Sequence, residues 1–196
     1  MTVSSIRYKP VDGGALGGHF ALHISLGAGN GPSGYFTSTE LTTRIREIFG
    51  QLELKSKVRG VLISCLEAVG DNEEMTSLVQ TLLDWGFMVI LWVKGETRYS
   101  WFDPRCYITV FVTTQHWPNF RVNEIRYVMP TDSNEWTEPD VYDDVNGRAA
   151  CYMAPKEASI PIIHFATECK RPWGLIGVSV DVAFLLKDPV NRPFNK

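Results

Sequence analysis

Residues 58–93, VRGVLISCLEAVGDNEEMTSLVQTLLDWGFMVILWV, decide the fold of this chain. Residues 60–63 form a short apolar run rich in β-branched side chains, which predicts a strand. An amphipathic helix follows, capped by Asp71 or Asn72. Residues 87–93 are a second apolar run, long enough for a strand that is buried on both faces. Two parallel strands joined by a helix make a right-handed βαβ unit, and such sheets bind ligands at the carboxyl ends of their strands.

The flanking segments also alternate between strand and helix patterns. Thr37 and Glu40 have the spacing of a capping box and predict the start of a further helix. Strand patterns lie at residues 19–26, 107–113, 121–129, 149–153 and 175–186, and a helix pattern lies at residues 160–170. We therefore expect an α/β fold, either a partial (β/α) barrel or an open, mainly parallel sheet of about six strands with outer helices.

Residues 1–18 are polar and glycine-rich, so we expect an N-terminal arm or hairpin there and a single α/β domain over residues 19–196. The core is expected to form from the apolar positions of the predicted strands and helices. These are Leu22, Ile24, Leu41, Ile45, Val61, Leu62, Ile63, Leu78, Leu82, Val89, Ile90, Leu91, Ile108, Val110 and Val112.

Charge and hydropathy restrict the partners of the protein. A net charge of −3 gives no global field that would attract nucleic acid or an anionic membrane. No apolar run approaches the roughly 18 residues of a membrane-spanning helix, and the first residues lack the apolar core of a signal peptide. We therefore expect a cytoplasmic protein whose partner is another protein or a second copy of itself, with a small molecule as a further option. The cysteines lack metal-ligand spacing, so we expect buried thiols and no metal. They are Cys65, Cys106, Cys151 and Cys169.

The loop at residues 29–34, GNGPSG, matches the G-x-G-x-x-G pattern of phosphate-binding loops. It follows a predicted strand and precedes a predicted helix, so its backbone N–H groups can approach a phosphate. Glu67 closes the next strand, where an acidic side chain could bind a ribose hydroxyl. Pro32 removes one N–H donor from the loop, and the alternative is a plain connecting loop.

Two histidines raise a different possibility. His23, in FALHISL, has the form of the histidine-x-serine strand motif of two-histidine phosphoesterases. That chemistry needs a second imidazole as acid or base, and His164, in IIHFAT, is the candidate although its hydroxyl lies one residue too far away. The alternative for His23 is an ordinary strand histidine. The acidic run at 132–144 lacks the pattern of a calcium loop, and the six scattered tryptophans do not predict a base-stacking platform.

The order of the segments from about residue 19 to residue 186 resembles the 7-carboxy-7-deazaguanine synthases, radical-SAM enzymes of the queuosine and deazapurine pathway. HISLGAGN at residues 23–30 resembles the first strand and cluster loop of that family. LISCLEAV at 62–69 is placed like the family's SAM-binding strand, and NEIRYVM at 123–129 is similar to its E-L-K-Y-V strand. The resemblance implies a radical-SAM-like partial barrel.

This sequence departs from that family at the residues that bind its iron cluster and its SAM. The family binds a four-iron cluster through three cysteines, but the first of them falls on Gly29 and no cysteine precedes Cys65 in this chain. Thiolates are the ligands that such clusters need. The glycine pair of the family's SAM motif falls on Cys65 and Leu66, while its glutamate is matched by Glu67. The family's substrate-side lysine falls on Arg126. The resemblance therefore implies a retained frame without radical-SAM catalysis, and we expect no cofactor.

Three functions follow as hypotheses. The first is a non-catalytic, radical-SAM-like scaffold that acts as a protein-binding or assembly component. The second is a nucleotide- or deazapurine-binding protein that uses the loop at 29–34 and Glu67. The third is a phosphoesterase that uses His23 and His164. The candidate ligand-binding residues are Gly29, Asn30, Gly31, Glu67, Lys94, Glu96 and Arg126.

Overall fold

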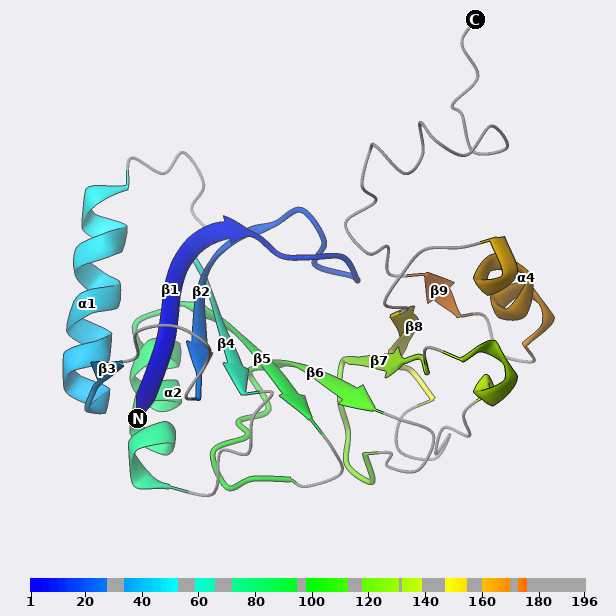
Figure 1. Ribbon diagram of the computed structural model, residues 1–196. Coiled ribbons are helices and arrows are strands. Elements are labelled where there is room, and N and C mark those ends of the chain that lie inside the picture. The colour runs from blue at the N-terminus through cyan, green and yellow to red at the C-terminus, as the bar shows by residue number, and fades with distance from the viewer. Residues whose placement is uncertain are drawn as a thin grey trace, which may run out of the picture.

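The computed structural model describes ten stretches of the chain, which together form one sheet with helices on one side (Figure 1). The described residues are 1–27, 34–52, 59–65, 72–94, 98–112, 118–130, 132–138, 147–154, 160–169 and 173–175. The strands are β1 (Thr2–Pro10), β2 (Phe20–Leu26), β3 (Gly34–Tyr35), β4 (Gly60–Cys65), β5 (Met88–Lys94), β6 (Tyr107–Val112), β7 (Glu124–Val128), β8 (Ala150–Ala154) and β9 (Gly174–Leu175). The helices are α1 (Ser38–Gln51), α2 (Glu73–Asp84), the 3-10 turn η1 (Ser133–Glu135) and α4 (Ile160–Glu168).

The sheet is open, with the strand order β3-β1-β2-β4-β5-β6-β7-β8-β9. Each neighbouring pair from β2 to β9 is parallel, whereas β1 runs antiparallel to both β2 and β3. The expected α/β fold with an open, mainly parallel sheet is confirmed. The described sheet has nine strands instead of about six, chiefly because residues 2–10 form a long strand along β2 and two-residue strands lie at both edges.

The βαβ unit predicted from residues 58–93 is present as β4, α2 and β5. β4 and β5 are parallel, with Gly60 opposite Met88 and Cys65 opposite Val93. The Asn72 side chain caps α2 by accepting from the Met75 N–H at 2.6 Å. The predicted capping box of α1 is also confirmed, since Thr37 and Glu40 exchange both bonds. None of the helices in the described stretches is long and apolar enough to cross a membrane.

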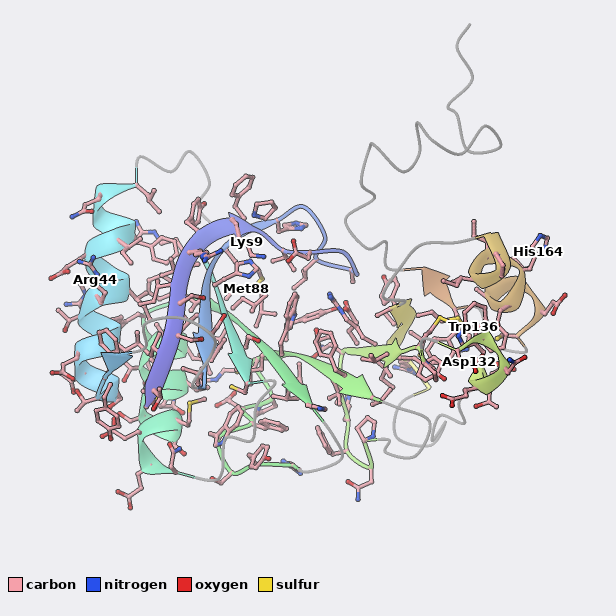
Figure 2. The ribbon with its side chains drawn as sticks, viewed as in Figure 1. Lys9, Arg44, Met88, Asp132, Trp136 and His164 are labelled. Atoms are coloured by element: carbon pink, nitrogen blue, oxygen red, sulfur yellow. The ribbon has the colours of Figure 1, made fainter. Side chains whose placement is uncertain are left out.

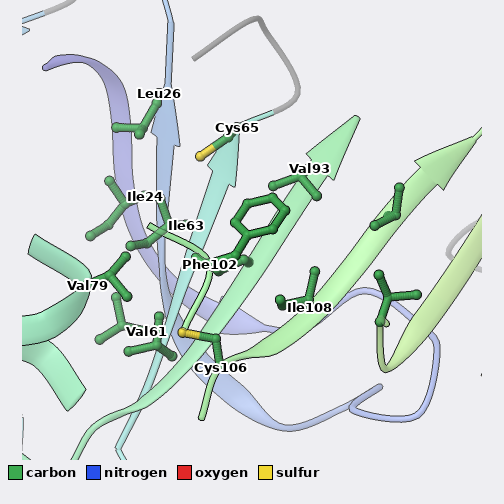
Figure 3. Packing of buried hydrophobic residues seen from close by; sticks show 14 of the residues in the cluster. Ile24, Leu26, Val61, Ile63, Cys65, Val79, Val93, Phe102, Cys106 and Ile108 are labelled. Atoms are coloured by element: carbon green, nitrogen blue, oxygen red, sulfur yellow. The ribbon is translucent and has the colours of Figure 1, made fainter. Parts of the chain in front are cut away.

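Alternation along the strands gives the sheet two different faces. The helix-covered face packs against α1, α2 and residues 98–106 and carries the main core, which includes Ile24, Ile63, Val79 and Phe102 (Figure 3). Every residue of the expected core is buried. Three of the cysteines are buried and Cys169 is half-buried, and all four are free thiols.

The opposite face, called the hairpin face below, is covered in part by the tip of the β1–β2 hairpin, residues 11–19. Val11 and Leu16 of this tip pack against Leu62 and Ile90 in a second, smaller apolar cluster. The hairpin face is formed by Ala21, His23, Ser25, Leu62, Ser64, Ile90, Trp92, Lys94, Tyr107, Thr109, Phe111, Glu124, Arg126 and Tyr152, which the strand register places on one side of the sheet. Many of these side chains are polar or aromatic, so this face differs chemically from the core on the other side.

Candidate functional site

Trp92 on β5 is the centre of a polar and aromatic cluster on the hairpin face. The register places it between Ser64 of β4 and Thr109 of β6, so all three side chains point to the same side. Its ring makes a T-shaped contact with the His23 imidazole, with centroids 6.1 Å apart, and another with Phe111 at 5.4 Å. Four strands therefore contribute to one continuous cluster, which we call the Trp92 cluster.

Three buried polar atoms of the Trp92 cluster have no hydrogen-bond partner in the described part of the chain: His23 Nε2, Trp92 Nε1 and Thr109 Oγ1. The side chains are well enclosed, since His23 is 6% exposed and Thr109 is 1% exposed. Leaving such a group unsatisfied costs about 1–3 kcal/mol. Buried polar atoms are normally hydrogen-bonded, so these three atoms, on β2, β5 and β6, call for a partner that the described residues do not supply, such as a ligand or a bound water.

His23 is neutral at neutral pH. Burial, followed by the positive charge of Lys9, lowers the pKa of His23, while Asp12 and a hydrogen bond to the backbone of Lys9 act in the opposite direction. A neutral imidazole has one N–H donor and one acceptor nitrogen. Because a backbone carbonyl accepts and Nε2 has no partner, we assign the donor to Nδ1 and the acceptor to Nε2.

A buried ion pair lies next to the Trp92 cluster and anchors the hairpin tip. Arg126 Nε donates to Glu124 Oε1 at 2.5 Å, and the two side chains are only 4% and 1% exposed. The Arg126 Nη1 and Nη2 groups donate to the backbone oxygens of Asp12 and Gly13 at 2.9 and 3.2 Å. The other Glu124 oxygen accepts the Ala15 N–H at 3.0 Å. The ion pair thus forms hydrogen bonds with both carbonyl oxygens and an N–H group of the tip backbone.

The tip approaches the ion pair so closely that only glycine fits at its centre. Gly14 has φ +73°, and a Cβ there would lie 2.4 Å from Glu124 Oε1. Tyr107 completes the arrangement, because its hydroxyl donates to Glu124 Oε2 at 3.1 Å. Burial and then the Glu124 charge raise the pKa of Tyr107, so this hydroxyl stays protonated. These contacts hold the hairpin tip in place beside the Trp92 cluster.

Two of the residues predicted to bind a ligand lie at the Trp92 cluster. The Arg126 guanidinium carbon is 4.6 Å from the Trp92 ring centroid, in a cation–π contact. Lys94 is exposed at the carboxyl end of β5 and pairs in register with Phe111, so it lies on the hairpin face beyond Trp92. The remaining predicted residues lie outside the described stretches. They are Gly29, Asn30, Gly31, Glu67 and Glu96.

The sequence did not predict that Trp92, Phe111 and Thr109 lie together, and it placed His23 in a phosphoesterase motif instead. The available signal was the alternation of polar or aromatic side chains with aliphatic ones in each inner strand, as in Trp92 and Lys94 after Ile90. Interpreting residues 87–93 as an apolar strand buried on both faces hid this signal. The scattered tryptophans concealed it further, since Trp92 acquires its neighbours only through strand pairing.

The structure does not bring His23 and His164 together. His23 lies on β2, whereas His164 is exposed on α4, which packs near β9 at the other end of the sheet. Six strand spacings of about 4.8 Å separate β2 from β9, roughly 29 Å in all. Figure 2 shows His164 far from Lys9, which lies in the β1–β2 hairpin. The imidazole pair of a two-histidine phosphoesterase is therefore not formed, because strand order separates the two motifs.

Metal-binding groups are not gathered in the described part of the chain. No three His, Cys, Asp or Glu side chains lie together there as a metal site. Cys65, at the place of the family's SAM-motif glycine, points into the core of the helix-covered face, where burial raises its pKa to about 12. Its thiol is therefore protonated at neutral pH. Asp132, from the acidic run, caps η1 by accepting from the Asn134 N–H at 2.9 Å, and residues 139–144 of that run are not described.

Comparison with known proteins identifies no relative. No protein-family model matches the chain, and no curated protein or solved structure matches it either. The functional argument therefore depends on the geometry of the Trp92 cluster itself.

Proposed function

We propose that this protein is a non-catalytic binding protein on a radical-SAM-like frame, and that it holds a planar polar small molecule at the Trp92 cluster. Nucleotides, nucleobases and deazapurines are the ligands expected from the sequence, and each has a flat ring with hydrogen-bonding edges. The observation that carries the proposal is the set of unsatisfied buried atoms on His23, Trp92 and Thr109. A ligand that bonds to them removes a cost of about 1–3 kcal/mol for each atom.

Half-buried aromatic rings beside these atoms offer contact area to a flat ligand. Trp92 and Phe111 both stand on the hairpin face at partial exposure, with ring centroids 5.4 Å apart. Stacking of a base on an aromatic side chain contributes about 1–3 kcal/mol. Apolar area combined with a few convergent polar groups is the usual composition of a small-molecule site.

The proposal is binding rather than catalysis because His23 lacks an acid–base partner in the described part of the chain. General acid–base chemistry needs titratable groups within hydrogen-bond reach of the reacting atoms. Glu124, the nearby carboxylate, is bonded to Arg126 and to the hairpin tip. The hydrogen bond of His23 is to the backbone of Lys9. His23 is therefore suited to accept a hydrogen bond from a ligand.

The described surface supports a small molecule better than the protein partner that the sequence also predicts. The large exposed apolar side chains come from four separate parts of the chain, so no single element presents an apolar strip. They are Phe20, Tyr35, Trp85 and Ile163. The Trp85 ring is also covered by Arg46, whose guanidinium carbon lies 3.9 Å from the ring centroid.

Calorimetric titration of the full chain with nucleobases, nucleotides, deazapurines, pterins and SAM tests the proposal. Trp92→Phe keeps a ring but removes the Nε1–H donor. It should weaken binding about fivefold, for the loss of a hydrogen bond of about 1 kcal/mol. Trp85→Phe, a matched change far from the Trp92 cluster, should bind as the wild type does. The proposal is wrong if no ligand binds with a Kd below about 1 mM, or if Trp92→Phe has wild-type affinity.

The non-catalytic part has its own test. The chain is reconstituted with iron and sulfide under reducing conditions and then incubated with SAM. We expect no stable iron cluster and no SAM cleavage. Bound iron together with SAM cleavage would contradict this part of the proposal while leaving the binding site in place.

A further inference from the structure

We infer that a cavity on the helix-covered face is a second ligand site, separate from the Trp92 cluster, and that it binds a small organic anion. The cavity has a volume of about 350 Å³ and lies where β6 and β7 begin. Ile108, in its wall, points away from the Trp92 cluster because its chain neighbours Tyr107 and Thr109 lie on the hairpin face.

The inner walls of the cavity are apolar and buried. The apolar side chains that line it are each 8% exposed or less, and they are Phe102, Cys106, Ile108, Phe120 and Val122 (Figure 3 shows the first three). Burial, followed by the charge of Asp103, raises the pKa of Cys106 to about 12, so its thiol adds no charge. The volume is near the lower end of the about 300–1,000 Å³ typical of small-molecule sites, so it suits one ring or a short chain.

The polar groups that remain available on the lining are all donors. Arg98 and Arg121 are exposed there, and neither has a hydrogen-bond or ion-pair partner among the residues that the structure describes. The Asn123 Oδ1 atom accepts the Ile108 N–H at 2.8 Å, which leaves the Nδ2 amide group as a donor.

The carboxylate on the described lining does not compete for these donors. Asp103 is paired with Arg105 through two bonds of 3.0 Å, from Nε to Oδ1 and from Nη2 to Oδ2. Its negative charge is therefore compensated from outside the cavity, and the charges of Arg98 and Arg121 are left for a ligand.

Two guanidinium groups and an amide donor select an anionic head group. Guanidinium groups bind carboxylates and phosphates through paired hydrogen bonds, and such charge-assisted bonds are about twice as strong as neutral ones. A cation would be repelled, and an uncharged group would gain only the weaker bonds. The ligand therefore places its apolar body against the buried walls and its carboxylate or phosphate at Arg98 and Arg121.

Benzoate, phenyl phosphate and benzamide test the inference because they share one ring and differ in the head group. Each is titrated into the full chain carrying 13C-labelled isoleucine δ1 methyl groups, followed by NMR. Ile108→Val identifies the Ile108 signal by its loss. We expect at least one of the two anions to shift this signal with a Kd below about 1 mM, and benzamide to bind about tenfold more weakly.

Surface variants separate charge recognition from general packing. Arg98→Gln and Arg121→Gln should each weaken binding of the anion about threefold and leave benzamide unchanged. Arg7→Gln, a matched change of an exposed arginine on β1, should bind as the wild type does. Asn123→Asp keeps an oxygen for the Ile108 N–H but replaces the amide donor with negative charge, so it should weaken the anion more than about tenfold.

Each outcome decides the inference without touching the Trp92 cluster. The tighter of the two anions identifies the head group as carboxylate or phosphate, and either result supports the site. Benzamide binding as tightly as both anions, or Arg7→Gln weakening the anion as much as Arg98→Gln, would overturn it. So would the absence of any shift of the Ile108 signal with either anion at about 10 mM. The proposed function stands or falls separately, by the titrations at Trp92.

Discussion

Replacing Thr109 with valine should stabilise the free protein and weaken ligand binding. Thr109 stands in the middle of β6, is 1% exposed, and its hydroxyl has no partner among the described residues. Valine has nearly the same shape and suits a strand, so the change exchanges a hydroxyl for a methyl group without disturbing the backbone. If the Thr109 hydroxyl were needed only for the fold, replacing it with a methyl group would not stabilise the protein.

The expected magnitude follows from the burial of the hydroxyl. An unsatisfied buried polar group costs about 1–3 kcal/mol, and a buried methyl group contributes about 0.8 kcal/mol. Only part of this gain is expected, because the side chains around Thr109 do not repack fully around a methyl group. We expect Thr109→Val to raise the free energy of unfolding by about 1–2 kcal/mol. For a chain of this size that corresponds to a rise in Tm of roughly 2–8 °C.

Thermal and urea unfolding, followed by tryptophan fluorescence, measure this change. Thr42→Val is the control, because the Thr42 hydroxyl donates to the Thr39 carbonyl at 3.0 Å. Losing that bond should leave stability unchanged or lower it by up to about 1.5 kcal/mol. If Thr109→Val is as destabilising as Thr42→Val or more so, the Thr109 hydroxyl is satisfied in the free protein and the reasoning is refuted.

Three further changes test the neighbouring structure. Glu124→Gln leaves Arg126 buried without its counter-charge and should cost about 3–5 kcal/mol, seen as a lower urea midpoint; a loss under about 1 kcal/mol would show that the pair is hydrated. Gly14→Ala should destabilise by about 1–3 kcal/mol, and by more than Gly18→Ala, which has a similar φ of +82° but open space around the added Cβ. Burial and the charge of Lys9 lower the pKa of His23 in the folded protein. The stability that the neutral imidazole contributes is therefore complete above the pKa of the unfolded chain, about 6.5. It is lost as the pH falls through the lower pKa of the folded protein. The Tm of His23→Gln should therefore fall less than that of the wild type between about pH 7.5 and pH 5, and parallel curves for the two proteins would contradict this assignment.

Local patterns were sufficient to predict most of the fold. The caps of α1 and α2, at Thr37 and Asn72, and the apolar runs that form β4 and β5 all follow from signals within a few residues. The extent of the sheet was harder to predict. The side chains of β1 are mostly half-buried or exposed and lack clear alternation, and the strand exists because it pairs along nearly all of β2.

The site could be predicted only in part. Lys94 and Arg126 were expected to contact a ligand, and both lie on the hairpin face. The ion pair between Arg126 and Glu124, two residues apart on one strand, was not predicted from the imperfect alternation of residues 121–129. Its acceptors at Asp12 and Gly13 lie more than a hundred residues away, at separations of 114 and 113.

The sequence by itself determined the βαβ unit of β4, α2 and β5, the capped helix α1 and the apolar layer beneath the helices, because periodicity and capping act over a few residues. Only the tertiary structure decided that Trp92 lies next to both His23 and Thr109 and that the polar atoms of these three side chains have no partner in the described chain. Hydrogen-bond satisfaction depends on every group packed around an atom, and strand register sets that environment for residues far apart in the sequence.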